Sequence, residues 1–281
     1  TLRAIDSPHA RTVIMGFVLH ESGGHRCVAF NDLVRGDDGV QANQFLIVHD
    51  EHSALIDPGG ALLYIPLQLA LGRYVRPHQL DLILCSHQDP DIIGSVDKWL
   101  LYTQASVVCS KLWGRFVPHL VPYYMENAGS ERYLLVDDEG ARIALGDAQV
   151  VALPAHFLHS VGNLSFYDET SGILFSGDVC SGLVSSGTAY GFVEDFDRYR
   201  PCMEGFHKRY MASNRAVRMW VDMVRELDLK KPPSISESID WARTLLLMGA
   251  DDIDAEVFQD SLSIIIKHRS DLDLVAEKIA P

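Results

Sequence analysis

A short apolar run that ends in polar residues decides the fold: Leu82-Ile83-Leu84-Cys85-Ser86-His87-Gln88-Asp89-Pro90-Asp91-Ile92-Ile93-Gly94. Residues 82–85 are apolar and bounded by polar positions, which predicts a buried strand. Three potential metal ligands follow at alternate positions: His87, Asp89 and Asp91. Pro90 disfavours the helical region for Asp89, so we expect the ligands to leave the strand end on a loop. Imidazole with carboxylates suits zinc, iron or manganese; a polar turn closing a strand is the alternative.

Composition restricts the class of protein. The 281 residues suffice for one large domain or two small ones, and 47% hydrophobic residues are ordinary for a globular core. Lys and Arg total 24 against 38 Asp and Glu, a formal charge of −14. Such an acidic chain is a poor candidate for nucleic-acid binding, which needs cations against phosphates.

Targeting and redox signals favour a reduced cytoplasmic protein. No apolar run approaches the roughly 20 residues of a membrane-spanning helix, and no secretory signal is visible near the first residue, Thr1. We therefore expect no membrane association. Five cysteines without CxxC spacing do not indicate a disulfide framework; they are Cys27, Cys85, Cys109, Cys180 and Cys202.

The N-terminal third predicts an antiparallel meander, because short β-prone runs alternate with polar breaks. The runs are residues 12–20, 26–31, 43–48 and 53–56. The last one ends in Asp57-Pro58-Gly59-Gly60, where Asp57 either orients ligands by hydrogen bonding or makes an Asx turn.

The middle of the chain alternates helices and strands, which is typical of an α/β unit. The pattern predicts helices over 61–71 and 92–103 and a strand over 105–109. Residues 132–135 and 141–145 flank a turn at Asp137-Asp138-Glu139-Gly140 and predict a hairpin.

A second group of candidate ligands follows predicted strands over 149–153, 164–167 and 173–176. His159 and Asp178 both lie just beyond strand ends, as His87 does. Loops of this kind can gather at one edge of a sandwich, so a cluster of two imidazoles and three carboxylates is expected. Asp178 has two oxygens with which to bridge two ions. His156 is interpreted as a hydrogen-bond partner that fixes its loop, with ligation as the alternative.

Four motifs in this order resemble the metallo-β-lactamase fold: Asp57-Pro58-Gly59, His87-x-Asp89-x-Asp91, His159-Ser160-Val161-Gly162 and Ser176-Gly177-Asp178. Within that fold the chain is most similar to the flavodiiron proteins and their relatives, the oxygen-binding di-iron proteins. Four phrases resemble the latter: residues 43–47, 86–92, 155–160 and 206–211. The resemblance covers most of residues 12–230.

The resemblance implies an α+β fold, a four-layer αββα sandwich with metals at the sheet edge. We expect one such domain over residues 1–281, with a core of about 12–245 and a helical tail over 246–281. The first iron would be held by His87, Asp89, His159 and Asp178. The second would share Asp178 and use Asp91 with additional histidines.

The chain departs from the flavodiiron pattern around the second metal. Ile92 stands where flavodiiron proteins carry a histidine, and Ile235 stands near the place of their last histidine. His207, Glu237 and His268 are candidates to complete that site by chemistry. A structural role is favoured for His207, which lies in a predicted amphipathic helix over 204–228.

The resemblance therefore implies a cytosolic iron protein that binds dioxygen or a related small oxidant for sensing or redox response. Zinc or manganese are alternative metals. A redox or signalling partner protein and a homodimer are further expectations. If the chain is catalytic, a flavodiiron-like oxidoreductase is favoured over a hydrolase. A metal-dependent hydrolase and a metal-poor interaction scaffold remain the alternative functions.

Overall fold

The computed structural model describes residues 16–31, 33–34, 39–120, 129–183, 192–193, 195–211 and 213–227. The chain divides into two compact units. Unit 1 comprises Thr1–Cys85, Asp89–Val108 and Pro118–Tyr133. Unit 2 comprises Ser86–Gln88, Cys109–Val117 and Leu134–Pro281. The single metallo-β-lactamase domain stays a prediction, and Ile235, Glu237, His268 and the 246–281 tail lie outside the described residues.

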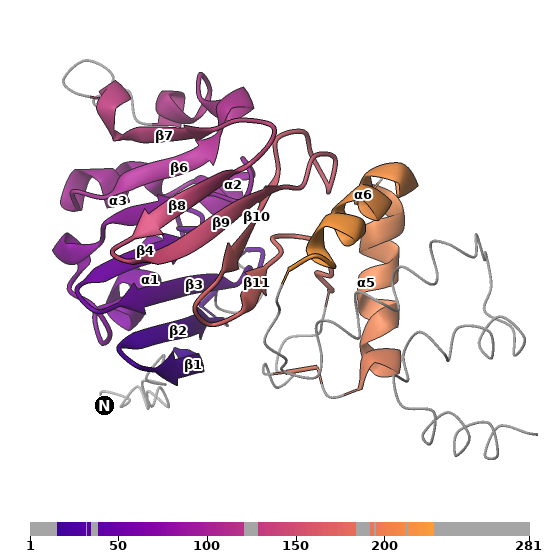
Figure 1. Cartoon of the computed structure of the whole chain (residues 1–281), viewed down its shortest axis with the longest axis horizontal. Helices are drawn as coiled ribbons and strands as arrows, with labels where there is room; N and C mark the ends of the chain where they lie inside the picture. The colour runs from indigo at the N-terminus through magenta and orange to yellow at the C-terminus, as the bar shows by residue number, and fades with distance from the viewer. Residues whose placement is uncertain are drawn as a thin grey trace, which may run out of the picture. The chain divides into compact units, whose positions relative to one another are not determined.

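The first sheet confirms the predicted meander. Its seven strands follow chain order from β1 to β7 (Figure 1). The first four pair antiparallel, and β4, β5 and β6 pair parallel. The strands are β1 (Phe17–Ser22), β2 (His25–Phe30), β3 (Gln44–His49), β4 (His52–Ile56), β5 (Leu82–Leu84), β6 (Ser106–Ser110) and β7 (Tyr133–Val136).

Helices cross between the parallel strands, as parallel pairing requires. They are α1 (Tyr64–Leu71), α2 (Pro90–Ile93) and α3 (Val96–Tyr102). Short 3₁₀ turns occupy Pro77–Gln79, Lys111–Trp113, Val117–Leu120 and Gly129–Arg132. The prediction of a continuous 92–103 helix was wrong. Ser95 donates its N–H to Gly59 O (3.0 Å), so this amide leaves the helical ladder and the chain restarts at Val96.

The predicted loop after β5 was only partly correct. Asp89 is extended, with ψ of 143°, as expected before a proline. Pro90, however, begins α2 at the first helical position, where its missing N–H costs nothing. Asp91 therefore lies on a helical turn. A Cβ on Gly60 would come within 3.1 Å of Asp91 Cα, so glycine permits this close approach.

The carbonyl of Pro58 anchors α3 in unit 1. It accepts hydrogen bonds from Ser95 Oγ (2.8 Å) and Trp99 Nε1 (3.2 Å). Trp99 is fully buried, and its ring packs edge-on against Tyr64 of α1 at 5.2 Å between centroids. Polar and apolar contacts thus fix α1 and α3 together.

The second sheet is antiparallel, with the order β11-β10-β9-β8 (Figure 1). Its strands are β8 (Ala141–Leu145), β9 (Ala148–Pro154), β10 (Leu164–Asp168) and β11 (Ile173–Phe175). The predicted hairpin of 132–135 with 141–145 was wrong, because β7 belongs to the first sheet and β8 to the second. The turn itself is present, since Gly140 N donates to Asp137 O. β8 pairs instead with β9.

In the described part of unit 2, the second sheet is followed by the helices α5 (Phe196–Tyr210) and α6 (Asn214–Val224). The single helix predicted over 204–228 was wrong. Ser213 is extended, and its hydroxyl accepts a hydrogen bond from Ala216 N, which caps a new helix. Apolar residues of α6 pack in one core with the second sheet and the loops around the candidate site: Trp220, Val221, Val224, Leu153, Leu158, Tyr167, Leu174 and Val179.

Among the residues that the structure describes, no helix is long and apolar enough to cross a bilayer.

The two faces of α1 give a direct test of the packing. Leu67 is fully buried and Leu69 is 70% exposed. We expect Leu67→Ala to lower the free energy of unfolding by about 2–5 kcal/mol, because it leaves a cavity. Leu69→Ala is the matched control and should change it by less than about 0.5 kcal/mol. Urea denaturation monitored by circular dichroism measures the free energy of unfolding of both variants. Equal decreases in the two variants would contradict the assigned faces of α1.

Candidate metal centre

Three of the predicted ligands converge in unit 2: His87, His159 and Asp178. One carboxylate oxygen, Asp178 Oδ2, lies 3.2 Å from His159 Nε2 and 3.7 Å from His87 Nε2. One ligand atom from each residue lies within 4.8 Å of the other two. The imidazole rings meet edge to face, 5.0 Å between centroids. All three come after strands in the sequence, β5, β9 and β11.

His87 is oriented by its neighbour. The residue is 3% exposed and follows β5. Its Nδ1 lies 2.9 Å from Ser86 Oγ, which leaves Nε2 as the nitrogen that faces Asp178. Ser86 O accepts a hydrogen bond from Leu164 N (2.8 Å), which ties the His87 segment to the start of β10. Metal-binding histidines commonly have their second nitrogen held in this way.

The loop that carries His159 is closed by its own hydrogen bonds. Ala155 N donates to Asn163 O, and the Asn163 side-chain amide donates to Leu158 O. Ser160 Oγ lies 2.8 Å from both Asn163 Oδ1 and Gln88 Oε1. Since Gln88 directly follows His87, Ser160 links the segments that carry the two imidazoles.

His156 has the loop-fixing role predicted for it. Its Nδ1 accepts a hydrogen bond from Gly162 N at 3.0 Å, and its Nε2 lies 3.6 Å from Asp138 Oδ1. Trp113 Nε1 donates to Val161 O in the same loop. Gly162 has a φ of +80°, and a Cβ there would lie 2.6 Å from Trp113 Nε1. Only glycine fits at position 162, because any side chain there would meet Trp113.

Asp178 lies on a turn whose peptide at Cys180 is held on both sides by α5. His207 Nε2 accepts from Cys180 N (2.8 Å), and Tyr199 OH donates to Cys180 O (2.8 Å). The second nitrogen of His207 lies 2.8 Å from Met203 O. Both of its ring nitrogens thus engage backbone groups, which confirms the structural role favoured for His207.

Burial sets the protonation states around this turn. It lowers the pKa of His207, against smaller opposing effects of Met203 O and the Asp178 carboxylate. Burial raises the pKa of Cys180 to about 11 and that of Tyr199 to about 12. A neutral His207 and a protonated Tyr199 are the forms that their hydrogen bonds to Cys180 require.

Aromatic residues of α5 also contact His159. Its ring meets those of Tyr210 and Phe206 edge-on, at 5.6 and 6.2 Å between centroids. Phe206 and Tyr210 pack on each other at 4.8 Å. Sequence reasoning missed these contacts. The signal that could have found them is the spacing of Phe206 and Tyr210, which places both on one side of a helix.

Asp89 and Asp91 belong to unit 1. Asp89 is the N-cap of α2, and its carbonyl accepts from Ile92 N and Ile93 N. Asp91 is the second residue of that helix. Asp89 is separated from His87 only by Gln88. Metal binding by all five residues stays a prediction.

The donor set fits a divalent transition metal. Imidazole nitrogens and carboxylate oxygens bind such ions at about 2.0–2.2 Å, so two ligands of one ion lie at most about 4.4 Å apart. The two Nε2–Oδ2 separations, 3.2 and 3.7 Å, satisfy this limit. Two imidazoles with a carboxylate suit zinc or iron better than calcium or magnesium, which prefer oxygen ligands.

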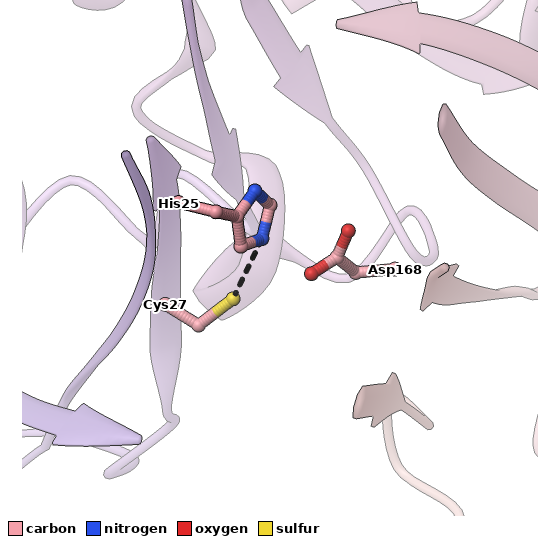
Figure 2. A group of neighbouring side chains, drawn as sticks. All are labelled: His25, Cys27 and Asp168. Atoms are coloured by element: carbon pink, nitrogen blue, oxygen red, sulfur yellow. Dashed lines mark hydrogen bonds between the residues drawn. The ribbon is translucent and has the colours of Figure 1, made fainter. Parts of the chain in front are cut away.

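A separate imidazole–thiol contact lies in unit 1. Cys27 Sγ is 3.6 Å from His25 Nε2 (Figure 2), and His25 Nδ1 is 3.1 Å from His49 Nδ1. His25 and Cys27 are buried on β2. Asp168, also drawn in Figure 2, belongs to unit 2, where its carboxylate accepts from Thr170 N and Ser171 N in a turn.

The hydrogen bonds of Asn163 predict that removing its side chain lowers the stability of the folded protein. Asn163 is 2% exposed, and truncation leaves Leu158 O without its side-chain donor. We expect Asn163→Ala to lower the free energy of unfolding by about 1–3 kcal/mol. Asn43→Ala, at an exposed position, is the control and should stay within about 0.5 kcal/mol of the wild type. Chemical denaturation checks both variants; unchanged stability of Asn163→Ala would contradict the loop closure.

Similarity to known proteins extends over most of the chain. The family model for "ODP family beta lactamase" matches residues 40–231. The structure of "chemotaxis sensor ODP" as a "peroxy diiron species" is 35% identical, with a TM-score of 0.70 over 81% of this chain and 94% of that one. The apo state of chemotaxis sensor ODP from T. denticola is 38% identical, with a TM-score of 0.66 over 76% and 83% of the two chains.

A single-residue mutant of a flavo di-iron protein from Thermotoga maritima shares the fold at 19% identity and a TM-score of 0.60. The alignment covers 77% of this chain and 56% of that one. These similarities confirm the predicted α+β metallo-β-lactamase fold.

Two curated proteins match over parts of their length. An uncharacterized protein of Methanocaldococcus jannaschii is 26% identical over 55% of this chain and 37% of its own. A putative diflavin flavoprotein of Synechocystis is 33% identical over 49% of this chain and 22% of its own. The chain thus spans well under half of these relatives.

Proposed function

Because the chain belongs to the ODP family of β-lactamase-fold proteins, we propose that it binds iron and uses the metal to sense dioxygen or a related small oxidant. The proposed ligands are His87, Asp89, Asp91, His159 and Asp178. The observation that carries the proposal is the convergence of two imidazole Nε2 atoms on Asp178 Oδ2, at 3.2 and 3.7 Å. A ferrous ion held by these residues would supply dioxygen binding.

The ligands have separate roles in this proposal. His87 and His159 would each offer a ring nitrogen to the metal, and the Ser86 hydroxyl holds the ring of His87 in place. Asp178 presents one oxygen to the histidine pair, and its second oxygen would be the one to hold another ion. Asp89 belongs with the first ion and Asp91 with the second. Zinc or manganese would fit the same groups.

The similar proteins support sensing over turnover. Two of the most similar solved structures are named as a chemotaxis sensor, at 35% and 38% identity. On this basis we propose a signalling or redox partner protein. A homodimer and a cytoplasmic location are proposed from the sequence alone. An oxidoreductase of the flavodiiron type is the catalytic alternative, which the fold shared with a flavo di-iron protein favours.

Ferrous iron titration under argon tests the metal site. We expect the wild type to bind iron and His87→Ala, His159→Ala and Asp178→Asn each to weaken binding. The loss should exceed the roughly 10–100-fold cost of removing an outer hydrogen-bond partner. His78→Ala, at an exposed histidine of unit 1, is the control and should bind as the wild type does.

Exposure to air then tests whether the iron-loaded protein responds to dioxygen. The iron-loaded wild type should change its absorption spectrum on mixing with air-saturated buffer, while the iron-free protein should not. A protein that takes up zinc but no iron, or an iron-loaded protein indifferent to air, would refute the oxygen-sensing function.

The two ions are expected to bind unequally. In the proposed assignment, the first ion would have two imidazoles and the carboxylates of Asp89 and Asp178, whereas the second would have Asp91 and the shared Asp178. Removing a hydrogen-bond partner of a metal ligand lowers metal affinity by roughly 10–100-fold. The absence of an imidazole ligand should lower it by at least as much. The second ion should leave first on dialysis, measured by metal counting. Two ions of equal, tight affinity would contradict this order and would require an additional ligand.

A further inference from the structure

We propose that His207, assisted by Tyr199, is a positioning residue for the metal ligand Asp178. The inference rests on the proposed function, because it takes Asp178 as a ligand. Neither residue binds the metal in this proposal. Both contact the backbone of Cys180, two residues beyond Asp178: His207 at its N–H and Tyr199 at its carbonyl.

The Cys180 backbone has an unusual conformation that needs external support. Its φ is +68°, a region that residues with side chains rarely occupy. α5 supplies a partner on each side of this residue: His207 accepts the Cys180 N–H, and Tyr199 donates to the Cys180 carbonyl, both at 2.8 Å. The left-handed turn is thus held at its donor and its acceptor.

A hydrogen bond to the helix backbone orients the side chain of His207 as an acceptor. Its Nδ1 lies 2.8 Å from Met203 O, one helical turn earlier, so this nitrogen carries the hydrogen of the neutral ring. Nε2 is then an acceptor and matches the Cys180 N–H. Tyr199 and His207 are eight residues apart, a little over two helical turns, so they project from the same side of α5.

The turn transmits this restraint to Asp178. Ser181 N donates to Asp178 O (3.1 Å), and Ser176 Oγ donates to Val179 O (2.8 Å). The first bond spans Cys180 and the second lies just before it, so the two bonds close the segment into a compact loop. A shift of the Cys180 peptide would therefore move the Asp178 carboxylate away from the two imidazoles.

The same helix contacts the other side of the site. Phe206 and Tyr210 pack edge-on against the ring of His159, while His207 and Tyr199 hold the Asp178 turn. One helix thus fixes the relative positions of an imidazole and a carboxylate that must share an ion. The geometry of the pair should depend on α5 more than on either loop alone.

Substitutions that differ in hydrogen-bonding capacity test the proposal. His207→Leu removes the acceptor for Cys180 N, whereas His207→Gln keeps an acceptor oxygen at a similar reach. Tyr199→Phe removes only the donor to Cys180 O. His78→Leu and Tyr102→Phe are controls for the same changes at exposed positions.

Three measurements are made on the wild type and each variant, all with the full chain. Ferrous iron affinity is measured under argon against a coloured chelator, Co²⁺ absorption reports the ligand geometry, and hydrogen exchange reports the Cys180 amide without metal. We expect His207→Leu to lower iron affinity by about 10–100-fold, alter the Co²⁺ spectrum and speed exchange at Cys180. His207→Gln should restore most of the affinity, and Tyr199→Phe should show a smaller loss.

The outcomes separate this inference from the proposed function. Wild-type affinity and an unchanged Co²⁺ spectrum in His207→Leu would overturn the positioning role while the iron site stands. Equal losses in His207→Gln and His207→Leu, with Cys180 exchange unchanged, would also overturn it. If His207→Leu does not fold, Tyr199→Phe decides by the same measurements. A wild type that binds no iron removes the proposed function and the inference together.

Discussion

One carboxylate oxygen between two imidazole nitrogens is the contact on which the site depends. Asp178 Oδ2 lies 3.2 and 3.7 Å from the histidine nitrogens, and a partly buried anion is costly unless such groups compensate it. The surrounding elements hold this arrangement. Ser86 turns the ring of His87, a closed loop presents His159, and α5 fixes the turn after Asp178. Each support comes from a different part of unit 2.

Local patterns were sufficient to predict most strands and three converging ligands. A strand such as β5 is short, wholly buried and apolar, so its end is visible in the sequence. His87 and Asp178 come three residues after β5 and β11, and His159 comes five residues after the longer, partly buried β9. Parallel or antiparallel neighbours bring strand ends to common edges, so the position of a ligand along the chain carries information about its position in space.

Tertiary contacts decided the features that the sequence did not reveal. Ser95 gives its amide to Gly59 rather than to a helix. Gly94 and Ser95 are residue types that end and begin helices, but the Gly59 acceptor lies outside the local 92–103 pattern. β8 pairs with β9 rather than with β7, although the Asp137–Gly140 turn has hairpin chemistry. The acceptor role of His207 likewise depends on a distant residue, because Cys180 lies 27 residues earlier in the chain. The left-handed backbone of Cys180 presents the N–H that His207 accepts.

The indole of Trp113 gives the protein a built-in optical reporter. Its Nε1 donates to Val161 O, two residues beyond His159, and its ring meets that of Phe116 edge-on. Indole emission responds to the polarity and hydrogen bonding of its surroundings. Trp99 and Trp220 are almost fully buried in cores, and the fourth tryptophan, Trp241, lies outside the described residues. The difference in emission between the wild type and Trp113→Phe therefore isolates the Trp113 signal, which follows the His159 loop in solution without any attached dye.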